Sequence, residues 1–158
     1  MEIDYIKQIS ELENNIKKNK IPLIADLVKE TFVAWYMLVE GNLLLREDYL
    51  QEILNRNINL IHTFYPGNPE LQFLQGWMIE ISPWFFDVED EDIGAKYLKL
   101  AYNAQPNNTL YKWALRDEMN IPKVLLAQMK VSLIIDYNKY YIDYTPIKEY
   151  FKDIVSNS

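Results

Sequence analysis

Residues 22–40 read PLIADLVKETFVAWYMLVE, and this stretch decides the fold class. Pro22 suits the first turn of a helix, and Gly41, directly after the stretch, suits its end. The second half, from Phe32 to Met37, is apolar nearly all round, which is typical of a helix covered on every side. We therefore predict that 22–40 forms the central, most buried helix of the molecule.

Outward from this stretch, apolar side chains recur at three- and four-residue steps, as on one face of a helix. The pattern predicts further helices over about 3–16, 46–64, 69–81, 93–104, 109–119, 122–137 and 145–154. Residues 131–137 also fit a short strand because Ile134 and Ile135 are β-branched, but the longer window keeps the helical period. We expect an all-α fold of about seven or eight helices, arranged as antiparallel hairpins in a single compact domain over 1–158.

Turn-forming residues support this expectation. Asn68-Pro69 and Thr145-Pro146 each place a capping side chain before a proline that suits the first helical position. The 158 residues include only 4 glycines and 7 prolines, too few for an all-β chain that turns every ten residues or so.

The charge balance narrows the class of partner. The net charge is −7, and an acidic domain is repelled by phosphate backbones and by anionic lipid. We therefore expect no nucleic-acid partner and no membrane partner, and we expect a basic protein partner instead. The oligomeric state stays open.

The residues that most active sites need are scarce. The chain has no cysteine, which excludes disulfides, thiolate metal sites and cysteine nucleophiles. His62 is the single histidine, and without cysteine it cannot complete the usual zinc ligand sets. No glycine-rich phosphate loop and no GxSxG motif occurs. We expect no catalytic residues, no metal and no cofactor, and interpret His62 as structural.

Two features bear on location. No apolar stretch approaches the roughly 20 residues that span a bilayer. The first ten residues are acidic and polar, unlike the cationic start of a signal peptide. We expect a cytoplasmic protein.

Two proline turns mark a partial repeat, 66–71 (PGNPEL) and 106–111 (PNNTLY). Gly94, Leu98 and Ala101 precede the second turn, and Gly76 follows the first. These small and large residues stand at the spacing of tetratricopeptide repeats, so residues 54–119 resemble a helical hairpin of that family. Small residues at such positions let paired helices approach closely.

The segment departs from that family's pattern in three ways. Gln72 and Gln75 stand where the family has apolar residues, and Leu54 and Ile61 stand where it has small ones. The prolines of the two turns also lie farther apart than the family's period of about 34 residues. The excess falls in the connection 83–92. An insertion between scaffold helices is a common place for function.

This connection has an aromatic half followed by an acidic half. Trp84, Phe85 and Phe86 precede five carboxylates in six residues, which are Asp87, Glu89, Asp90, Glu91 and Asp92. Three consecutive aromatic side chains cannot all face one core, and aromatic anchors ringed by charge are typical of binding interfaces. We predict that these eight residues contact the partner.

Plainer interpretations stay open for each feature. The acids could form a solvated loop whose last members stabilise the positive end of helix 93–104, and the aromatic residues could cap two helix ends. A tyrosine-rich C-terminal region, formed by Tyr137, Tyr140, Tyr141, Tyr144 and Tyr150, could be a binding face or helix packing, and packing is favoured.

A small, acidic, cytoplasmic helical chain without cysteine resembles the immunity proteins of bacterial contact-dependent growth inhibition and polymorphic toxin systems. The resemblance is one of general character. It implies a tight complex that neutralises a basic toxin, such as a nuclease, by covering its active site. The alternatives are a tetratricopeptide-like adaptor that binds a peptide, and a helical protein or enzyme that binds a small ligand between its helices.

Overall fold

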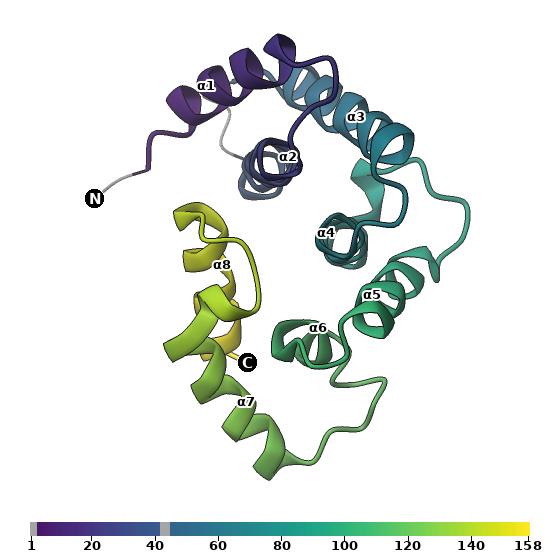
Figure 1. Ribbon diagram of the computed structural model, residues 1–158, viewed down its shortest axis with the longest axis vertical. Helices are drawn as coiled ribbons and strands as arrows, with labels where there is room; N and C mark the ends of the chain where they lie inside the picture. Colours follow the sequence, from purple (N-terminus) through teal and green to yellow (C-terminus); the bar gives the residue numbers. More distant parts are fainter. Residues whose placement is uncertain (1–2, 42–44) are drawn as a thin grey trace.

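The fold is all-α. A computed structural model describes residues 3–41 and 45–158, and within these it contains eight α-helices and two short 3-10 helices (Figure 1). In chain order they are α1 (Tyr5–Lys18), α2 (Ile24–Glu40), α3 (Glu47–Phe64), α4 (Pro69–Ile81), η1 (Pro83–Phe85), α5 (Ile93–Ala104), α6 (Thr109–Ala114), α7 (Lys123–Asp136), η2 (Tyr137–Lys139) and α8 (Thr145–Ser156).

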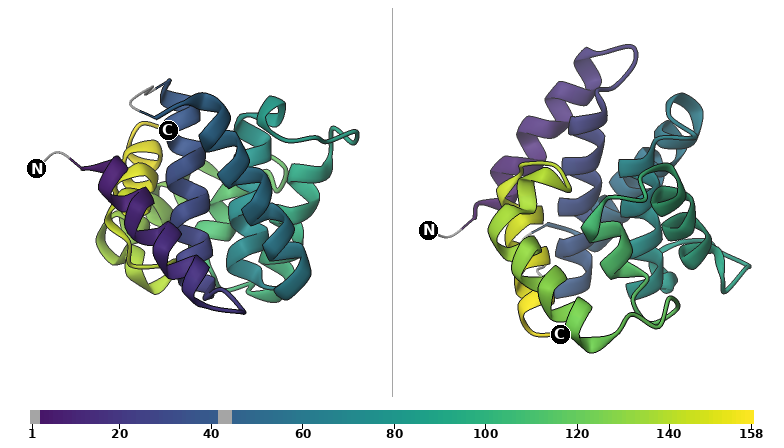
Figure 2. Two further views of the ribbon diagram at one scale, coloured as in Figure 1. Left: turned by 90° about the horizontal axis from the view of Figure 1, so that it is seen from above. Right: turned by 60° about the horizontal axis from the view of Figure 1, so that its bottom comes forward.

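The helices follow one another around a shared core. The α2 helix packs against α1, α3 and α4, and α4 packs against α5 on its other side. The chain continues through α6 and α7, and α8 then returns to lie against α2 (Figures 1 and 2). The helices α2, α4 and α8 therefore enclose the centre of the molecule, and 22–40 is the central element that the sequence predicts.

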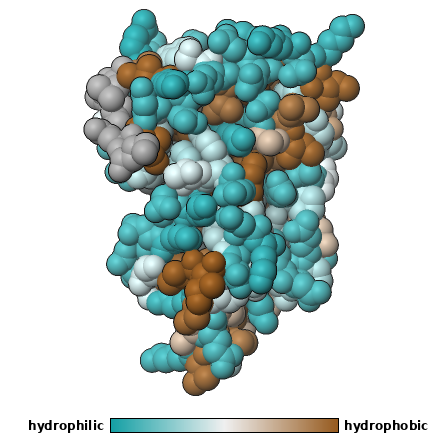
Figure 3. Space-filling view, turned by 60° about the vertical axis from the view of Figure 1, so that its left-hand side comes forward, coloured by the Kyte–Doolittle hydropathy of each residue, from teal (hydrophilic) through white to brown (hydrophobic). Residues whose placement is uncertain are grey.

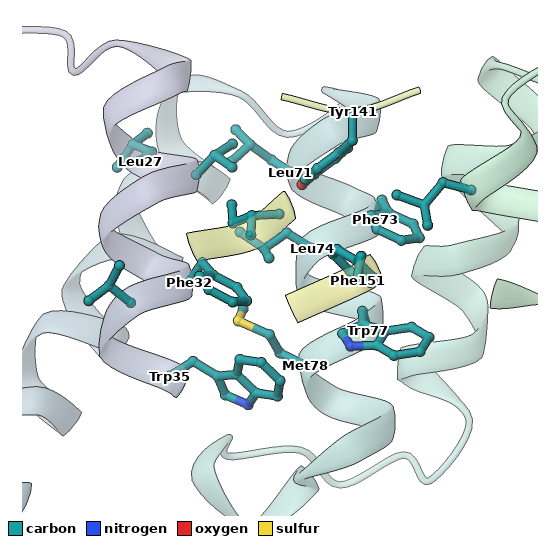
Figure 4. Packing of buried hydrophobic residues seen from close by; sticks show 14 of the residues in the cluster. Leu27, Phe32, Trp35, Leu71, Phe73, Leu74, Trp77, Met78, Tyr141 and Phe151 are labelled. Atoms are coloured by element: carbon teal, nitrogen blue, oxygen red, sulfur yellow. The ribbon is translucent and has the colours of Figure 1, made fainter. Parts of the chain in front are cut away.

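The core between these three helices is strongly aromatic. Phe32 and Trp35 of α2, Trp77 of α4 and Phe151 of α8 meet there, all buried (Figure 4). Their rings adopt tilted and edge-on arrangements, with 5.3 Å between the Trp77 and Phe151 centroids. Burying one such side chain contributes roughly 1.5–3 kcal/mol. The aromatic cluster is therefore the main source of stability that joins the N-terminal helices to α8.

Several helix ends form as their residues predict. The Asn68 side chain accepts a hydrogen bond from the Leu71 amide at 3.1 Å, and Asn108 does the same for Tyr111 at 3.2 Å. Gly41 ends α2 with φ of 64°, a left-handed conformation that favours glycine.

Several predicted helix starts are wrong by one or two residues, and the structure explains those of α2 and α8. The α2 helix begins at Ile24 because Pro22 is held outside it, where its carbonyl accepts a hydrogen bond from the Tyr65 hydroxyl at 2.6 Å. Thr145 is the first residue of α8 and not its cap, since extended Tyr144 precedes the helix and Pro146 fits within its first turn.

The predicted helix 109–119 is shorter than expected. The α6 helix ends at Ala114, where amides begin to bond three residues back, from Leu115 to the Lys112 carbonyl and from Arg116 to the Trp113 carbonyl. The following turns close at Asn120, whose φ of 50° is left-handed. Residues 131–136 lie inside α7, which confirms the helical interpretation over the strand.

The paired helices α4 and α5 approach closely, as the small residues predict. A Cβ atom on Gly76 would lie 2.8 Å from both the Gly94 carbonyl oxygen and the Leu98 amide nitrogen. A Cβ atom on Gly94 would meet only the Glu80 side chain, which is exposed and can move aside. Glycine at position 76, which faces backbone, is therefore what sets the spacing of the hairpin.

The outer face of α7 is apolar. Val124, Val131 and Ile135 are exposed at spacings that place them on one side of the helix, and an apolar patch covers this part of the surface (Figure 3). Across residues 3–41 and 45–158, none of the helices combines the length and apolar character that crossing a membrane requires.

Candidate functional site

The connection between α4 and α5 is fastened at its base to two other helices. Ser82, which is fully buried, accepts a hydrogen bond from the Trp35 indole at 2.7 Å and donates to the Met78 carbonyl at 3.1 Å. Gln51 of α3 donates to the Phe85 carbonyl at 2.9 Å. These bonds fix where the connection leaves the scaffold, so the residues after Phe85 start from a defined position.

The three consecutive aromatic residues divide between surface and core. Trp84 is 72% exposed, whereas Phe85 and Phe86 are half-buried and pack against the hydrophobic core. The Trp84 and Phe85 rings lie 5.8 Å apart. One large aromatic side chain is thus presented to solvent on a short 3-10 turn whose neighbours are anchored.

The five carboxylates all point outward, and most of them carry no counter-ion. Asp90 accepts a hydrogen bond from the Asp92 amide at 2.9 Å and pairs with Lys96, which lowers the pKa of Asp90. Among the residues that the structure describes, Asp87, Glu89, Glu91 and Asp92 form no salt bridge. Asp92 occupies the cap position of α5 without a side-chain capping bond. The acidic half therefore carries four uncompensated carboxylates, and within the described chain only Asp90 has a salt-bridge partner, Lys96.

A groove of about 740 Å³ opens beside this connection. One wall is α3, the other is α5 with the connection, and α4 contributes side chains between them. Its polar lining consists of Asn55, Asn59, His62, Gln75 and Tyr97, its acidic lining of Asp87, Glu89 and Asp90, and its apolar lining of Ile58, Ile79, Phe86, Val88 and Ile93. Four of the eight predicted contact residues line the groove, while Trp84, Phe85, Glu91 and Asp92 lie outside its lining.

His62 lies at the polar part of this groove with two partners. The Gln75 amide nitrogen is 3.2 Å from His62 Nε2, and the Tyr97 hydroxyl is 3.3 Å from the same atom. Both neighbours thus meet the imidazole at the same ring nitrogen. The imidazole and the Tyr97 ring are stacked at 6.4 Å. His62 is thus oriented by neighbours that sequence reasoning did not identify.

The sequence carried two signals for this polar lining. Asn55, Asn59 and His62 recur at four- and three-residue steps, which places them on one face of α3. Gln75 is only 2% exposed and interrupts a run of apolar side chains on α4. A buried amide needs a hydrogen-bonding partner, and it marks a polar site within an apolar helix.

A second carboxylate group, which sequence reasoning missed, lies buried between α1, α2 and α3. Arg56 pairs with Glu13 at 2.6 Å and with Glu30, and the Asn57 amide donates to Glu30 at 2.8 Å. Burial and the neighbouring Glu13 raise the pKa of Glu30 to about 8. Desolvation opposes ionisation of Glu13, but the hydrogen bonds from Arg56, Glu30 and Lys17 and the charge of Arg56 together outweigh it and lower the pKa of Glu13 to about 2.

The two carboxyl groups share one proton as a consequence. Glu30 Oε2 is buried without a hydrogen-bond partner, whereas Glu13 Oε1 lies 2.6 Å from the Arg56 guanidinium. A proton on Glu30 gives that group a donor and leaves Glu13 as the charged partner of Arg56. This cluster joins three helices, and its three charged residues do not line the groove beside the α4–α5 connection.

The tyrosine-rich C-terminal region is mainly packing. Tyr137 and Tyr141 are buried, and the Tyr141 hydroxyl donates to the Glu70 carbonyl at 2.8 Å. The Trp77 indole donates to the Tyr150 hydroxyl at 2.9 Å, and burial raises the pKa of Tyr150 to about 12. Tyr140, Tyr144 and Tyr150 are partly open to solvent. These contacts favour the packing interpretation.

In the parts of the chain that the structure describes, no three histidine, aspartate or glutamate side chains converge as metal ligands. No family model matches the chain, and searches of curated proteins and of solved structures found no match.

Proposed function

We propose that this chain is a protein-binding module for a basic partner and acts as an immunity protein, which neutralises a basic toxin by covering its active site. One observation carries the proposal. Trp84 is 72% exposed in the same connection as four carboxylates that form no salt bridge in the described chain, and residues 86–90 of that connection line a groove of about 740 Å³. An exposed tryptophan next to charge has the composition of an interface hot spot.

The anchored base of the connection favours tight binding. The bonds from Trp35 to Ser82 and from Gln51 to Phe85 hold the start of the segment in place before a partner arrives. Less conformational entropy is then lost when the complex forms, and affinity rises accordingly. The net charge of −7 adds electrostatic steering, which speeds the capture of a basic partner.

The second candidate is a tetratricopeptide-like adaptor that binds a peptide, and the close α4–α5 pairing at Gly76 favours it. An adaptor of this kind would need a free surface along its helices. The face that α2 and α4 share is filled by Tyr150 and Phe151 of α8. The groove between α3 and α5 is the surface left for such a role, so both candidates point to the same site.

The test is protection of a host cell. The chain is co-expressed with the C-terminal domain of any large secreted protein encoded beside its gene, and growth is measured. We expect protection, and a one-to-one complex whose affinity falls as salt rises. A quadruple variant should abolish both protection and complex formation. It combines Asp87→Asn, Glu89→Gln, Glu91→Gln and Asp92→Asn. The matched control, Glu47→Gln with Asp48→Asn, changes exposed acids at the start of α3. Equal loss in both variants, or protection that survives the first, contradicts the proposed surface.

A further inference from the structure

We propose that the groove between α3 and α5 takes an extended, arginine-bearing segment of the partner. This inference rests on the proposed function and names the chemistry that the same site selects. The groove volume of about 740 Å³ falls in the range of roughly 300–1,000 Å³ that is usual for ligand-binding clefts and cavities. That is room for a few residues in an extended conformation.

The charge of the lining selects a cation. Asp87, Glu89 and Asp90 line the groove, and its described lining contains neither lysine nor arginine. Lys96, which lies outside that lining, pairs with Asp90, whereas Asp87 and Glu89 have no salt-bridge partner among the described residues and are available to a cationic ligand. A basic side chain that enters gains Coulomb attraction from both carboxylates and meets no competing cation on the walls.

The aromatic residues of the lining favour arginine over lysine. Phe86 stands directly before the acids, and Tyr97 faces the groove from α5. A planar guanidinium can stack on such rings while its N–H groups bond a carboxylate at two points. A lysine ammonium is a compact point charge that offers no flat surface for stacking.

The polar side chains of α3 suit an extended backbone. Asn55, Asn59 and His62 follow the groove at steps of four and three residues, a rise of about 6 Å and about 4.5 Å along the helix. An extended chain presents its backbone groups on one side every second residue, about 6.6 Å apart. Side-chain amides both donate and accept, so the Asn55 and Asn59 amides match the peptide groups of a strand laid along α3.

The test uses two short peptides, acetyl-Gly-Arg-Gly-Arg-Gly-amide and its lysine counterpart, titrated into the full ¹⁵N-labelled protein. We expect saturable changes in amide chemical shift centred on Asn55, Asn59 and Tyr97. The arginine peptide should bind at least about fivefold more tightly than the lysine peptide, because its guanidinium stacks on aromatic rings and binds a carboxylate at two points. Shifts spread over the whole acidic surface, equal affinities for the two peptides, or the absence of saturation would each overturn the inference.

A matched pair of variants separates this inference from the proposed function. Asn59→Lys places a tethered cation in the groove from an exposed helical position, and Gln128→Lys adds the same charge on the exposed face of α7. Asn59→Lys should weaken arginine-peptide binding at least about tenfold, by direct competition for the carboxylates, whereas Gln128→Lys should leave it nearly unchanged. Circular dichroism checks that both variants stay folded.

The toxin assay and the peptide titration test different proposals. If the toxin is neutralised equally by the Asn59→Lys variant, the groove plays no part and the inference is wrong, while the immunity function stands. If the arginine peptide binds the groove and no basic partner is bound or neutralised, the immunity function is wrong and the groove chemistry stands.

Discussion

Glu13 and Glu30 lie buried between three helices, whereas Asp87 and the four acids that follow it stand on an exposed connection. The buried pair shares one arginine and one proton, and the pKa values of its two members move in opposite directions. The exposed group keeps four charges without a counter-ion in the described chain. Carboxylates therefore have two roles here: the buried ones join helices, and we propose that the exposed ones bind a partner.

The largest expected effect comes from removing the shared cation. Arg56→Ala leaves buried Glu13 paired only with exposed Lys17 among the described residues, and it removes the cation beside Glu30, so we expect it to lower the free energy of unfolding by about 3 kcal/mol. Urea denaturation measures this loss. The matched control is Arg46→Ala, since Arg46 pairs with Asp48 at the surface and its removal should cost under about 0.5 kcal/mol. Equal losses in the two variants would remove the contrast between the clusters.

The shared proton predicts an unusual dependence of stability on pH. The folded protein raises the pKa of Glu30 to about 8, so between the usual carboxyl range and pH 8 the folded state holds a proton that the unfolded state has released. Stability from Glu30 therefore falls as pH rises through this window. The opposite sign applies to Glu13, whose lowered pKa adds stability that is lost as pH falls from about 4.5 toward 2.

Glu30→Gln isolates the first of these two contributions. Glutamine reproduces the neutral carboxyl group, so stability at pH 5 should stay within about 1 kcal/mol of the unmodified protein. The decline between pH 5 and 8 should largely disappear, as followed by urea denaturation at several pH values. A decline that persists in this variant would show that another group holds the proton.

Neutralising the exposed acids should have a smaller effect of opposite sign. With Asp87, Glu89, Glu91 and Asp92 changed to their amides, mutual repulsion is relieved, and we expect a gain in stability of about 0.5 kcal/mol or less at low salt. Thermal melts at low and high salt measure it, and the gain should vanish at high salt. A clear loss of stability would mean that these acids hold the connection in place.

Trp84→Ala should have the smallest effect on the free protein. Its side chain is 72% exposed, so the change should alter the free energy of unfolding by no more than about 0.5 kcal/mol. Affinity for the proposed partner should nonetheless drop by about 2 kcal/mol, the scale of an interface hot spot, as measured by calorimetry. A large stability loss without an affinity loss would assign Trp84 to packing.

Residue periodicity predicted the helices well where it ran long and unbroken, as in 22–40 and 93–104. It failed at ends that distant contacts decide. The Tyr65 hydroxyl holds Pro22 outside α2, and these two residues are 43 positions apart in the chain.

The candidate site was predictable in part for the same reason. Asp87 to Asp92 stand out as a local run, whereas the groove joins Asn59 to Tyr97 and Asp87 through the packing of three helices. The Glu13, Glu30 and Arg56 cluster likewise joins residues from three helices, and no local pattern pairs them. Local sequence patterns show where charged residues lie along the chain, but only the tertiary structure shows which of them contact one another.

The exposure of Trp84 gives the protein an optical reporter. The other three tryptophans, Trp35, Trp77 and Trp113, are buried. Long-wavelength emission and accessibility to an added quencher such as iodide should therefore come mainly from the one indole beside the acidic run. A partner that covers this surface would shift the emission to shorter wavelength and protect it from quenching, so binding at this site can be followed in the unlabelled protein.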